Sequence, residues 1–342
     1  MQLVSTYKIE ELNSETVDKI EDLYQTFKST AIKAYGFVYE PLPFEEFKKV
    51  VNAQLIKGFV LSTEEGYDSF LLYIFEEFRS IELNVIFVNN QENSIQKRFT
   101  LTKALIDKYK NNKDWDVISY PMLGLQQSFV KDIAVLGFDF VGQAVVNFEL
   151  TNPISIKILN NINIPKLPEG YSLESWDDKY SEQASEVINE SFKNAKDALF
   201  DPRFLTIEGS KLLVHQITSG VFGPFIAKAT TLLMYNGRVE GVCFINAASV
   251  GTMNIPLIGI KKEHRHKGFG ECILYNTIKQ ALQMFKNGQL IPKVINAGVE
   301  TENYPALRMY RKIGFREDYI YTHSFINKAR LELIEKINKN IP

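Results

Sequence analysis

The stretch Asn303-Tyr304-Pro305-Ala306-Leu307-Arg308-Met309-Tyr310-Arg311-Lys312-Ile313-Gly314-Phe315 follows the pattern Asn-x-x-Ala-x-x-x-Tyr-x-x-x-Gly-Phe. Asn303 can cap a helix, and Pro305 suits a first helical turn, where its missing N–H is not needed. We expect a helix over 304–313, and Gly314-Phe315 marks its junction with a strand over 318–326. So long a pattern rarely arises by chance in a chain of ordinary composition.

A second motif, Arg265-His266-Lys267-Gly268-Phe269-Gly270, comes earlier in the chain and opens an amphipathic segment over 270–285. Glycines let a backbone approach phosphate oxygens without Cβ clashes, and a helix N-terminus offers unpaired N–H groups. The three basic side chains could also reach phosphate oxygens. The motif predicts a phosphate-binding loop, although a glycine-rich loop without a ligand would have the same composition.

The two motifs, in this order, resemble those of the GCN5-related N-acetyltransferase (GNAT) superfamily. The resemblance implies an enzyme that uses acetyl-CoA as co-substrate. In that family, the strand before the loop diverges from the next strand at a bulge, and the pantetheine arm lies in the gap. The cofactor-binding residues that the resemblance implies are Leu257, Ile258, Gly259, Ile260, Arg265, His266, Lys267, Gly268, Phe269, Gly270, Asn303, Ala306 and Tyr310.

Acetyl transfer to an amine needs a proton acceptor for the amine and a proton donor for the departing thiolate. By the resemblance, Tyr310 is the general acid; the less favoured alternative is that a tyrosine at this helical spacing packs in a core. Glu300 is our candidate base, with Glu240 second; a strand-end glutamate without a catalytic role is as plausible. We interpret His215 as structural and His264 as solvent-facing, and expect no metal, because no Cys/His/carboxylate cluster has ligand spacing.

A similar succession of elements precedes Gly137-Phe138, which predicts a tandem repeat. We expect two GNAT domains, each a mixed, mostly antiparallel, twisted sheet flanked by helices, over residues 1–155 and 156–342. The boundary falls in a proline-containing connecting segment over 152–170. The tandem layout and the run Val299-Glu300-Thr301-Glu302-Asn303 resemble the mycothiol synthase family.

The first copy lacks the groups that the motifs supply. Aligned on the Gly-Phe pair, Gln126 replaces Asn303, Phe129 replaces Ala306 and Ile133 replaces Tyr310. The stretch 89–98, which precedes its helix, contains no glycine. We therefore predict a degenerate N-terminal domain that does not bind CoA.

Composition limits the partners. The 342 residues carry 39 Lys+Arg against 41 Asp+Glu, so no basic excess exists to hold nucleic acid or an anionic membrane. The chain also lacks the apolar run of about 20 residues that spans a membrane. With only Cys243 and Cys272 as thiols, a reducing, cytoplasmic location is expected. A monomer is preferred, because the repeat itself could supply the pairing of two domains.

The acceptor should be a primary amine of a small molecule or peptide, bound by the stretch Asn194–Phe225. Its aromatic and charged residues are Phe200, Asp201, Arg203, Phe204, Phe222 and Phe225, although the phenylalanines could instead belong to the core. A non-catalytic acyl-CoA sensor on the same scaffold is an alternative function. An aminoacyl transferase with a tRNA donor fits the neutral charge less well.

Overall fold

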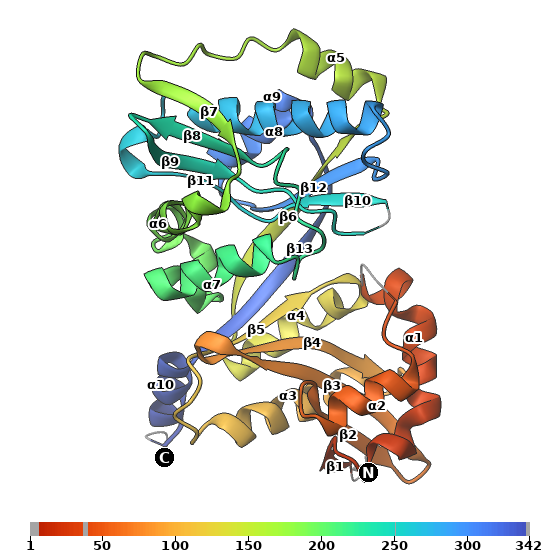
Figure 1. Cartoon of the computed structure of the whole chain (residues 1–342). Helices are drawn as coiled ribbons and strands as arrows, with labels where there is room; N and C mark the ends of the chain where they lie inside the picture. Colours follow the sequence, from red (N-terminus) through yellow and green to blue (C-terminus); the bar gives the residue numbers. More distant parts are fainter. Residues whose placement is uncertain (1–6, 37–39, 250, 340–342) are drawn as a thin grey trace. The chain divides into compact units, whose positions relative to one another are not determined.

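The computed structural model describes residues 7–36, 40–249 and 251–339 (Figure 1). They divide into two compact units. Unit 1 comprises residues 1–141 and 321–342, and unit 2 comprises residues 142–320. Two elements, β6 and β13, pass from one unit to the other.

Unit 1 has a sheet in the order β1-β2-β3-β4-β5, with the C-terminal part of β13 next to β5. Helices α1 and α2 pack on one face of it, and α3 and α4 pack on the other, so the buried side chains of β3 alternate between the two cores. The bounds are β1 Lys8–Glu11, α1 Glu21–Tyr35, α2 Phe44–Asn52, β2 Lys57–Thr63, β3 Gly66–Glu76, β4 Ser80–Val88, α3 Ser94–Tyr109, β5 Val117–Met122, α4 Val130–Ile133 and α10 Lys328–Lys339.

Unit 2 holds a four-stranded antiparallel sheet, β11-β9-β8-β7, and the strands β6, β12 and β10 side by side. Helix α8 packs on one face of β8 and β9, while α6 and α7 cover the other (Figure 1). The bounds are β6 Asp139–Glu149, α5 Pro153–Asn161, β7 Tyr171–Ser175, α6 Ser181–Phe192, α7 Ile207–Thr218, β8 Thr231–Tyr235, β9 Arg238–Cys243, β10 Thr252–Ile255, β11 Ile258–Ile260, α8 Phe269–Lys286, β12 Val294–Glu300, α9 Tyr304–Ile313 and β13 Arg316–Asn327.

The compact units differ from the consecutive segments 1–155 and 156–342 expected from the sequence. Residues 143–149 of β6 pair antiparallel with β12, so they belong to unit 2. Residues 322–327 of β13 pair antiparallel with β5, so they belong to unit 1. Strand pairing decides which residues are in contact. Most of β6, at the end of the first half of the chain, therefore belongs to unit 2, and the last part of β13, near the end of the second half, belongs to unit 1.

The helix predicted over 304–313 is confirmed as α9. Asn303 caps it, since its Oδ1 accepts from the backbone N–H of Ala306 at 3.2 Å. Leu307, Tyr310 and Ile313 are buried at helical spacing, and each such side chain stabilises the fold by about 2 kcal/mol. Gly314 ends the helix with a left-handed φ of 112°.

The connecting segment predicted over 152–170 contains a helix, α5, whose N-terminus is capped by Asn152 and whose first residue is Pro153. The chain before the phosphate-loop motif forms two short strands, β10 and β11, which lie in different sheets. Between them stands Pro256, which has no N–H to continue a strand ladder.

Both units contain one parallel strand pair at corresponding places. In unit 1, residues Ser80–Glu82 of β4 pair with Val117–Ser119 of β5, and in unit 2, β10 pairs with Val294–Ala297 of β12. Beyond these short ladders the two strands of each pair diverge. The repeat therefore places a gap between diverging strands in each unit.

Replacing Gly223 with alanine should lower the free energy of unfolding of unit 2 by about 2 kcal/mol or more. Gly223 has a φ of 95°, and an added Cβ would lie 2.2 Å from the carbonyl oxygen of Ala247. Gly298→Ala is the matched control, because its Cβ meets nothing within 4 Å, and it should change stability by less than about 0.5 kcal/mol. Denaturant titration measures both, and equal losses would contradict the prediction.

Candidate active site

The gap in unit 2 opens where the chain leaves β12 after Ile255. Strand β11 pairs with β9, with Ile258 opposite Cys243, while residues 298–300 of β12 pair with β6. A cavity of about 980 Å³ is lined by β11, the end of α6 and the first turns of α9, and it continues to the N-terminus of α8. Of the predicted cofactor residues, those lining it are Ile258, Gly259, Ile260, Arg265, His266, Gly268, Phe269, Gly270, Asn303 and Ala306.

The N-terminus of α8 has the form that phosphate binding requires. Gly268 takes a left-handed φ of 80°, and no side chain caps the helix. The first backbone N–H groups of α8 therefore stay available to an anion. A Cβ on Gly268 would lie 2.9 Å from Pro165, and one on Gly270 would lie 3.0 Å from the sulfur of Met309. Both glycines are needed to keep this end of the cavity open.

The three basic residues of the loop differ in position. Arg265 lines the cavity, but its Nε donates to the carbonyl of Ile260 at 2.9 Å and its Nη2 donates to that of Ser191 at 3.2 Å. Arg265 thus ties the loop to β11 and to the end of α6. His266 lines the cavity, whereas Lys267 does not.

Gly259 is also required by close packing, because a Cβ there would lie 2.8 Å from the hydroxyl of Ser191. Leu257, another of the predicted cofactor-binding residues, does not line the cavity. It packs beside the core between α6 and α7, and its carbonyl accepts from Phe244 N at 3.0 Å. The cavity wall formed by this strand therefore starts at Ile258.

Tyr310 is buried, with 2 % of its surface exposed, and it does not line the cavity. Its ring meets Phe315 edge-on at 5.0 Å between centroids. Burial raises the pKa of Tyr310 far above its usual range, and the nearby Cys243 thiol adds to the shift. Because Cys243 pairs with Ile258, the phenol lies on the core side of the strands that form the cavity wall.

Glu300 is held in place by its neighbours. Its Oε1 accepts from the backbone N–H of Glu302 at 2.8 Å and from Lys196 Nζ at 3.2 Å. Lys196 also pairs with Glu302, and these contacts raise the pKa of Lys196. The side chain of Glu300 does not line the cavity. The bridge joins the loop after α6 to the turn before α9.

Asp197 is a candidate base that sequence analysis missed. It lies in a short 3₁₀ turn, Lys196–Leu199, and its half-buried side chain lines the cavity. Burial raises the pKa of Asp197, and the carboxylates of Glu300 and Asp201 raise it further. No motif marks this residue, since a single aspartate in a loop is common in any chain.

The other candidates are not at the cavity surface, with one exception. Glu240 is buried beside Lys261, with 3.0 Å between Nζ and Oε2, and does not line the cavity. His215 is exposed on α7 and away from it. His264 was predicted to face solvent, which is wrong: it is 7 % exposed and lines the cavity.

The residues singled out between 194 and 225 do not line the cavity either. Phe204 is buried and stacks on Phe192 at 4.7 Å between centroids. Asp201 and Arg203 are paired at 2.7 Å. Phe222 and Phe225 pack against the same core as Phe204. From the predicted stretch, the cavity is lined by Asn194, Ala195 and Asp197.

One group of potential metal ligands exists among the described residues. Oxygen or nitrogen atoms of Glu240, Glu263 and His264 lie within 4.8 Å of one another. The ammonium of Lys261 already sits 3.0 Å from the Glu240 carboxylate. A second cation there would be repelled, so the group is better explained as a buried ion-pair network.

In unit 1 the corresponding gap is filled by side chains. Gln126 is 1 % exposed, and its Oε1 accepts from Tyr120 Oη at 2.7 Å and from the backbone N–H of Ile86 at 3.2 Å. Counted from the parallel ladders, Ile86 corresponds to Ile258, and buried Phe87 to Gly259. The backbone donor that would face a ligand is therefore already taken.

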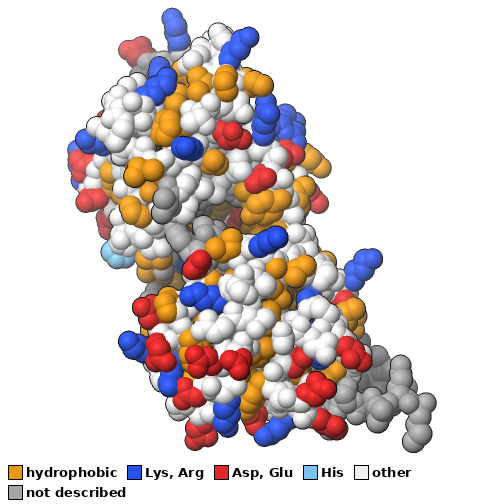
Figure 2. Space-filling model, turned by 90° about the vertical axis from the view of Figure 1, so that its right-hand side faces the viewer, with side chains coloured by type: hydrophobic (Ala, Val, Ile, Leu, Met, Phe, Trp, Pro, Cys, Tyr) orange, Lys and Arg blue, Asp and Glu red, His pale blue; other side chains and the backbone are white. Residues whose placement is uncertain are grey.

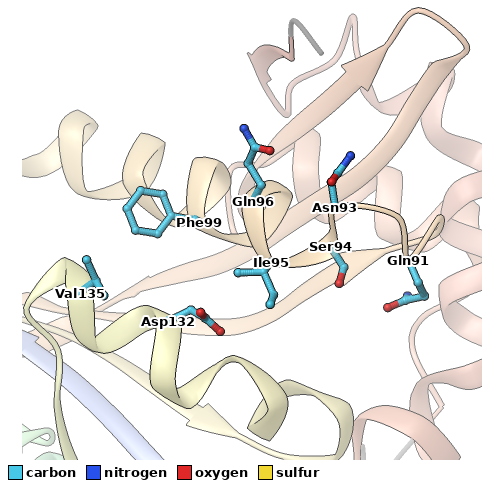
Figure 3. A pocket seen from close by; sticks show the side chains of 8 residues that line it. All are labelled: Gln91, Asn93, Ser94, Ile95, Gln96, Phe99, Asp132 and Val135. Carbon is cyan, nitrogen blue, oxygen red and sulfur yellow. The ribbon is translucent and has the colours of Figure 1, made fainter. Parts of the chain in front are cut away.

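The helix start of unit 1 also differs. Asn93, with a φ of 55°, takes the place of Gly268 before α3, and Ile95 stands where unit 2 has Gly270. Figure 3 shows Ile95 of α3 and Asp132 of α4 facing the same cavity, of about 550 Å³. Its described lining includes a carboxylate and no Lys or Arg. Lys97 points away, paired with buried Asp68 at 3.0 Å. These features disfavour a pyrophosphate.

No protein-family model matches the chain, and no curated protein matches its sequence. Solved structures do match. A GCN5-related N-acetyltransferase from Sphaerobacter thermophilus is 13 % identical, with a TM-score of 0.62 over 94 % of this chain and 96 % of that one. A tandem GNAT protein from the clavulanic acid biosynthesis pathway is 11 % identical, with a TM-score of 0.55 over 94 % and 99 %.

The chain has the tandem GNAT fold. A third match is the glucosamine N-acetyltransferase region of a fungal multi-domain β-N-acetylglucosaminidase, 12 % identical, with a TM-score of 0.61 over 95 % of this chain and 38 % of that one. At these identities the likeness establishes the fold of this chain and not its substrates.

On the face shown in Figure 2, Lys and Arg side chains are interspersed with Asp and Glu. Among the described residues, no helix is both long enough and apolar enough to cross a membrane.

Proposed function

We propose that unit 2 is an acyl-CoA-dependent N-acetyltransferase, which moves acetyl from acetyl-CoA to a primary amine of a small molecule or peptide. The observation that carries the proposal is the cavity lined by the edge strand β11, the end of α6 and the first turns of α9, which runs to the uncapped N-terminus of α8. One cavity thus joins the edge of a sheet to a helix N-terminus that suits phosphate, the two surfaces that an acyl-CoA needs.

Acetyl-CoA supplies the activated acetyl group as a thioester. On the chain's side, Ile258 and Gly259 of the edge strand β11 line the cavity, next to Ile260, whose carbonyl already accepts from Arg265. The N–H groups at the start of α8 suit a pyrophosphate, and His266 lines the same end. A backbone N–H of this strand could also stabilise charge on the thioester carbonyl oxygen.

Tyr310 is our general acid. Its raised pKa keeps the phenol protonated near neutral pH. A thiol has a pKa of about 8.5 in water, but a thiolate formed in a desolvated gap becomes more basic. This raises the proton affinity of the acceptor, but a phenol is still a weaker acid than a thiol, so Tyr310 is a weak donor in our proposal.

Asp197 fits the base better than Glu300 does. It lines the cavity, and its raised pKa gives it more affinity for a proton than an exposed aspartate has. Glu300 does not line the cavity, and its Oε1 is already bonded to Lys196 Nζ and to the backbone N–H of Glu302. Glu300 acts in our proposal by holding the loop that carries Asp197.

Titration with acetyl-CoA should show one site per chain, because only unit 2 has an open gap among the described residues. Gly270→Leu should abolish this binding, since the new side chain enters the phosphate end of the cavity. The matched control is Ile95→Leu at the corresponding position of unit 1, which should leave affinity unchanged. Two sites, or binding that survives Gly270→Leu, would contradict the assignment.

Tyr310→Phe should lower the rate of acetyl transfer by about 100-fold while the acetyl-CoA dissociation constant changes less than about twofold. Thiol release with a panel of amines, together with calorimetry, measures the two quantities. Tyr304→Phe, at an exposed tyrosine on the same helix, is the control. A wild-type protein that binds acetyl-CoA but acetylates no amine would favour the alternative function, a non-catalytic acyl-CoA sensor.

Asp197→Asn should lower turnover at least about tenfold and remove the acidic limb of the pH profile. That limb should lie above 3.8, the ordinary pKa of an aspartate, because the native pKa is raised. A pKa higher in the native than in the unfolded state means that ionisation disfavours folding, so the variant should be no less stable at neutral pH. Glu300→Gln is the comparison; if it alone removed the limb, Glu300 would be the base.

A further inference from the structure

A buried polar network lies beneath the loop that starts α8. Its members are Tyr171 on β7, Glu240 on β9, and Lys261 and His264 in the loop. Glu240, Lys261 and His264 are 6 %, 8 % and 7 % exposed. The proposed chemistry uses none of these side chains, and so large a group of buried polar atoms calls for a separate explanation.

The contacts run in one chain from β7 to β9. Tyr171 Oη lies 2.8 Å from His264 Nδ1, and His264 Nε2 lies 3.6 Å from Glu240 Oε2. Lys261 Nζ lies 3.0 Å from the same carboxylate oxygen, and the backbone N–H of Lys261 donates to the carbonyl of Glu240 at 3.0 Å. The network therefore joins the first residues of the loop to two strands of the sheet.

Tyr171 also contacts the far end of the loop. Its ring lies 4.5 Å from that of Phe269, the first residue of α8, between centroids. The same tyrosine thus touches His264 at the start of the loop and Phe269 at its end. The ring of Tyr235 supports it from the side, at 4.4 Å.

The loop between these contacts needs support. His266 has a φ of 61° and Gly268 one of 80°, so two residues in three are left-handed. For a non-glycine residue such as His266 this conformation is strained, and it persists only where surrounding contacts impose it. Arg265 holds the loop on the side of α6, and His264 holds it on the side of β7.

We propose that Tyr171 is a positioning residue for the phosphates of acyl-CoA, and this inference rests on the proposed function. Through its hydroxyl it holds His264, and through its ring it holds Phe269, so that the backbone N–H groups of the loop stay directed into the cavity. Tyr171 itself does not line the cavity, so any effect on binding must pass through the loop.

Tyr171→Phe removes only the hydroxyl and keeps the ring contacts. It should raise the dissociation constant of acetyl-CoA about tenfold, as expected for losing one buried hydrogen bond that sets the loop. The constant for S-acetylpantetheine, which has no pyrophosphate, should change less than about twofold. Tyr235→Phe is the matched control, because no hydrogen bond from its hydroxyl to the loop occurs among the described residues, and both constants should stay unchanged.

A second variant, His264→Asn, removes the imidazole but can still bond to the Tyr171 hydroxyl. Combined with Tyr171→Phe, it should weaken acetyl-CoA binding no more than the stronger single change does, because both act through one contact. If Tyr171→Phe weakened the binding of acetyl-CoA and of S-acetylpantetheine equally, or weakened neither, the role of Tyr171 would be refuted while the proposed function would stand. A wild-type protein that binds neither ligand would instead refute the proposed function.

Discussion

The divergence of the chain from β12 at Pro256 is the constraint on which the candidate site depends. Strands β10 and β11 follow each other in the chain but lie in different sheets. Strand β10 pairs with β12, and β11 pairs with β9. Pro256 cannot donate to a ladder, which makes it a suitable residue at the change. Unpaired backbone edges are costly when dry, so they must meet water, side chains or a ligand.

The two units meet this requirement differently. In unit 1, the side-chain oxygen of Gln126 accepts a hydrogen bond from the backbone N–H of Ile86, and the buried ring of Phe87 fills the gap between the strands. In unit 2, Gly259 and Ala306 leave the same space open. Side chains that fill such a gap become part of the hydrophobic core and stabilise the fold. An open gap lacks this stabilisation but leaves a surface on which a ligand can bind.

Much of the fold could be predicted because it depends on local patterns. Asn303, Pro305 and Gly314 mark the ends of α9, and the glycines before α8 mark a helix that begins without a side-chain cap. Burial of His264 could not be predicted, because it depends on Tyr171, which lies 93 residues away in the chain. The exchange of β6 and β13 was missed for the same reason: strand partners are set by long-range pairing.

The site residues that sequence analysis found and those that it missed differ in kind. The loop glycines are marked in the sequence because Gly268 takes a left-handed φ, and because a Cβ on Gly268 or Gly270 would closely approach Pro165 or Met309. Asp197 has no such local requirement. Its role follows from where it is buried, next to Glu300 and Asp201, and the raised pKa that results is a property of the folded site. Loop glycines therefore locate the proposed donor end of this cavity from sequence, while the proposed acceptor end can be located only in three dimensions.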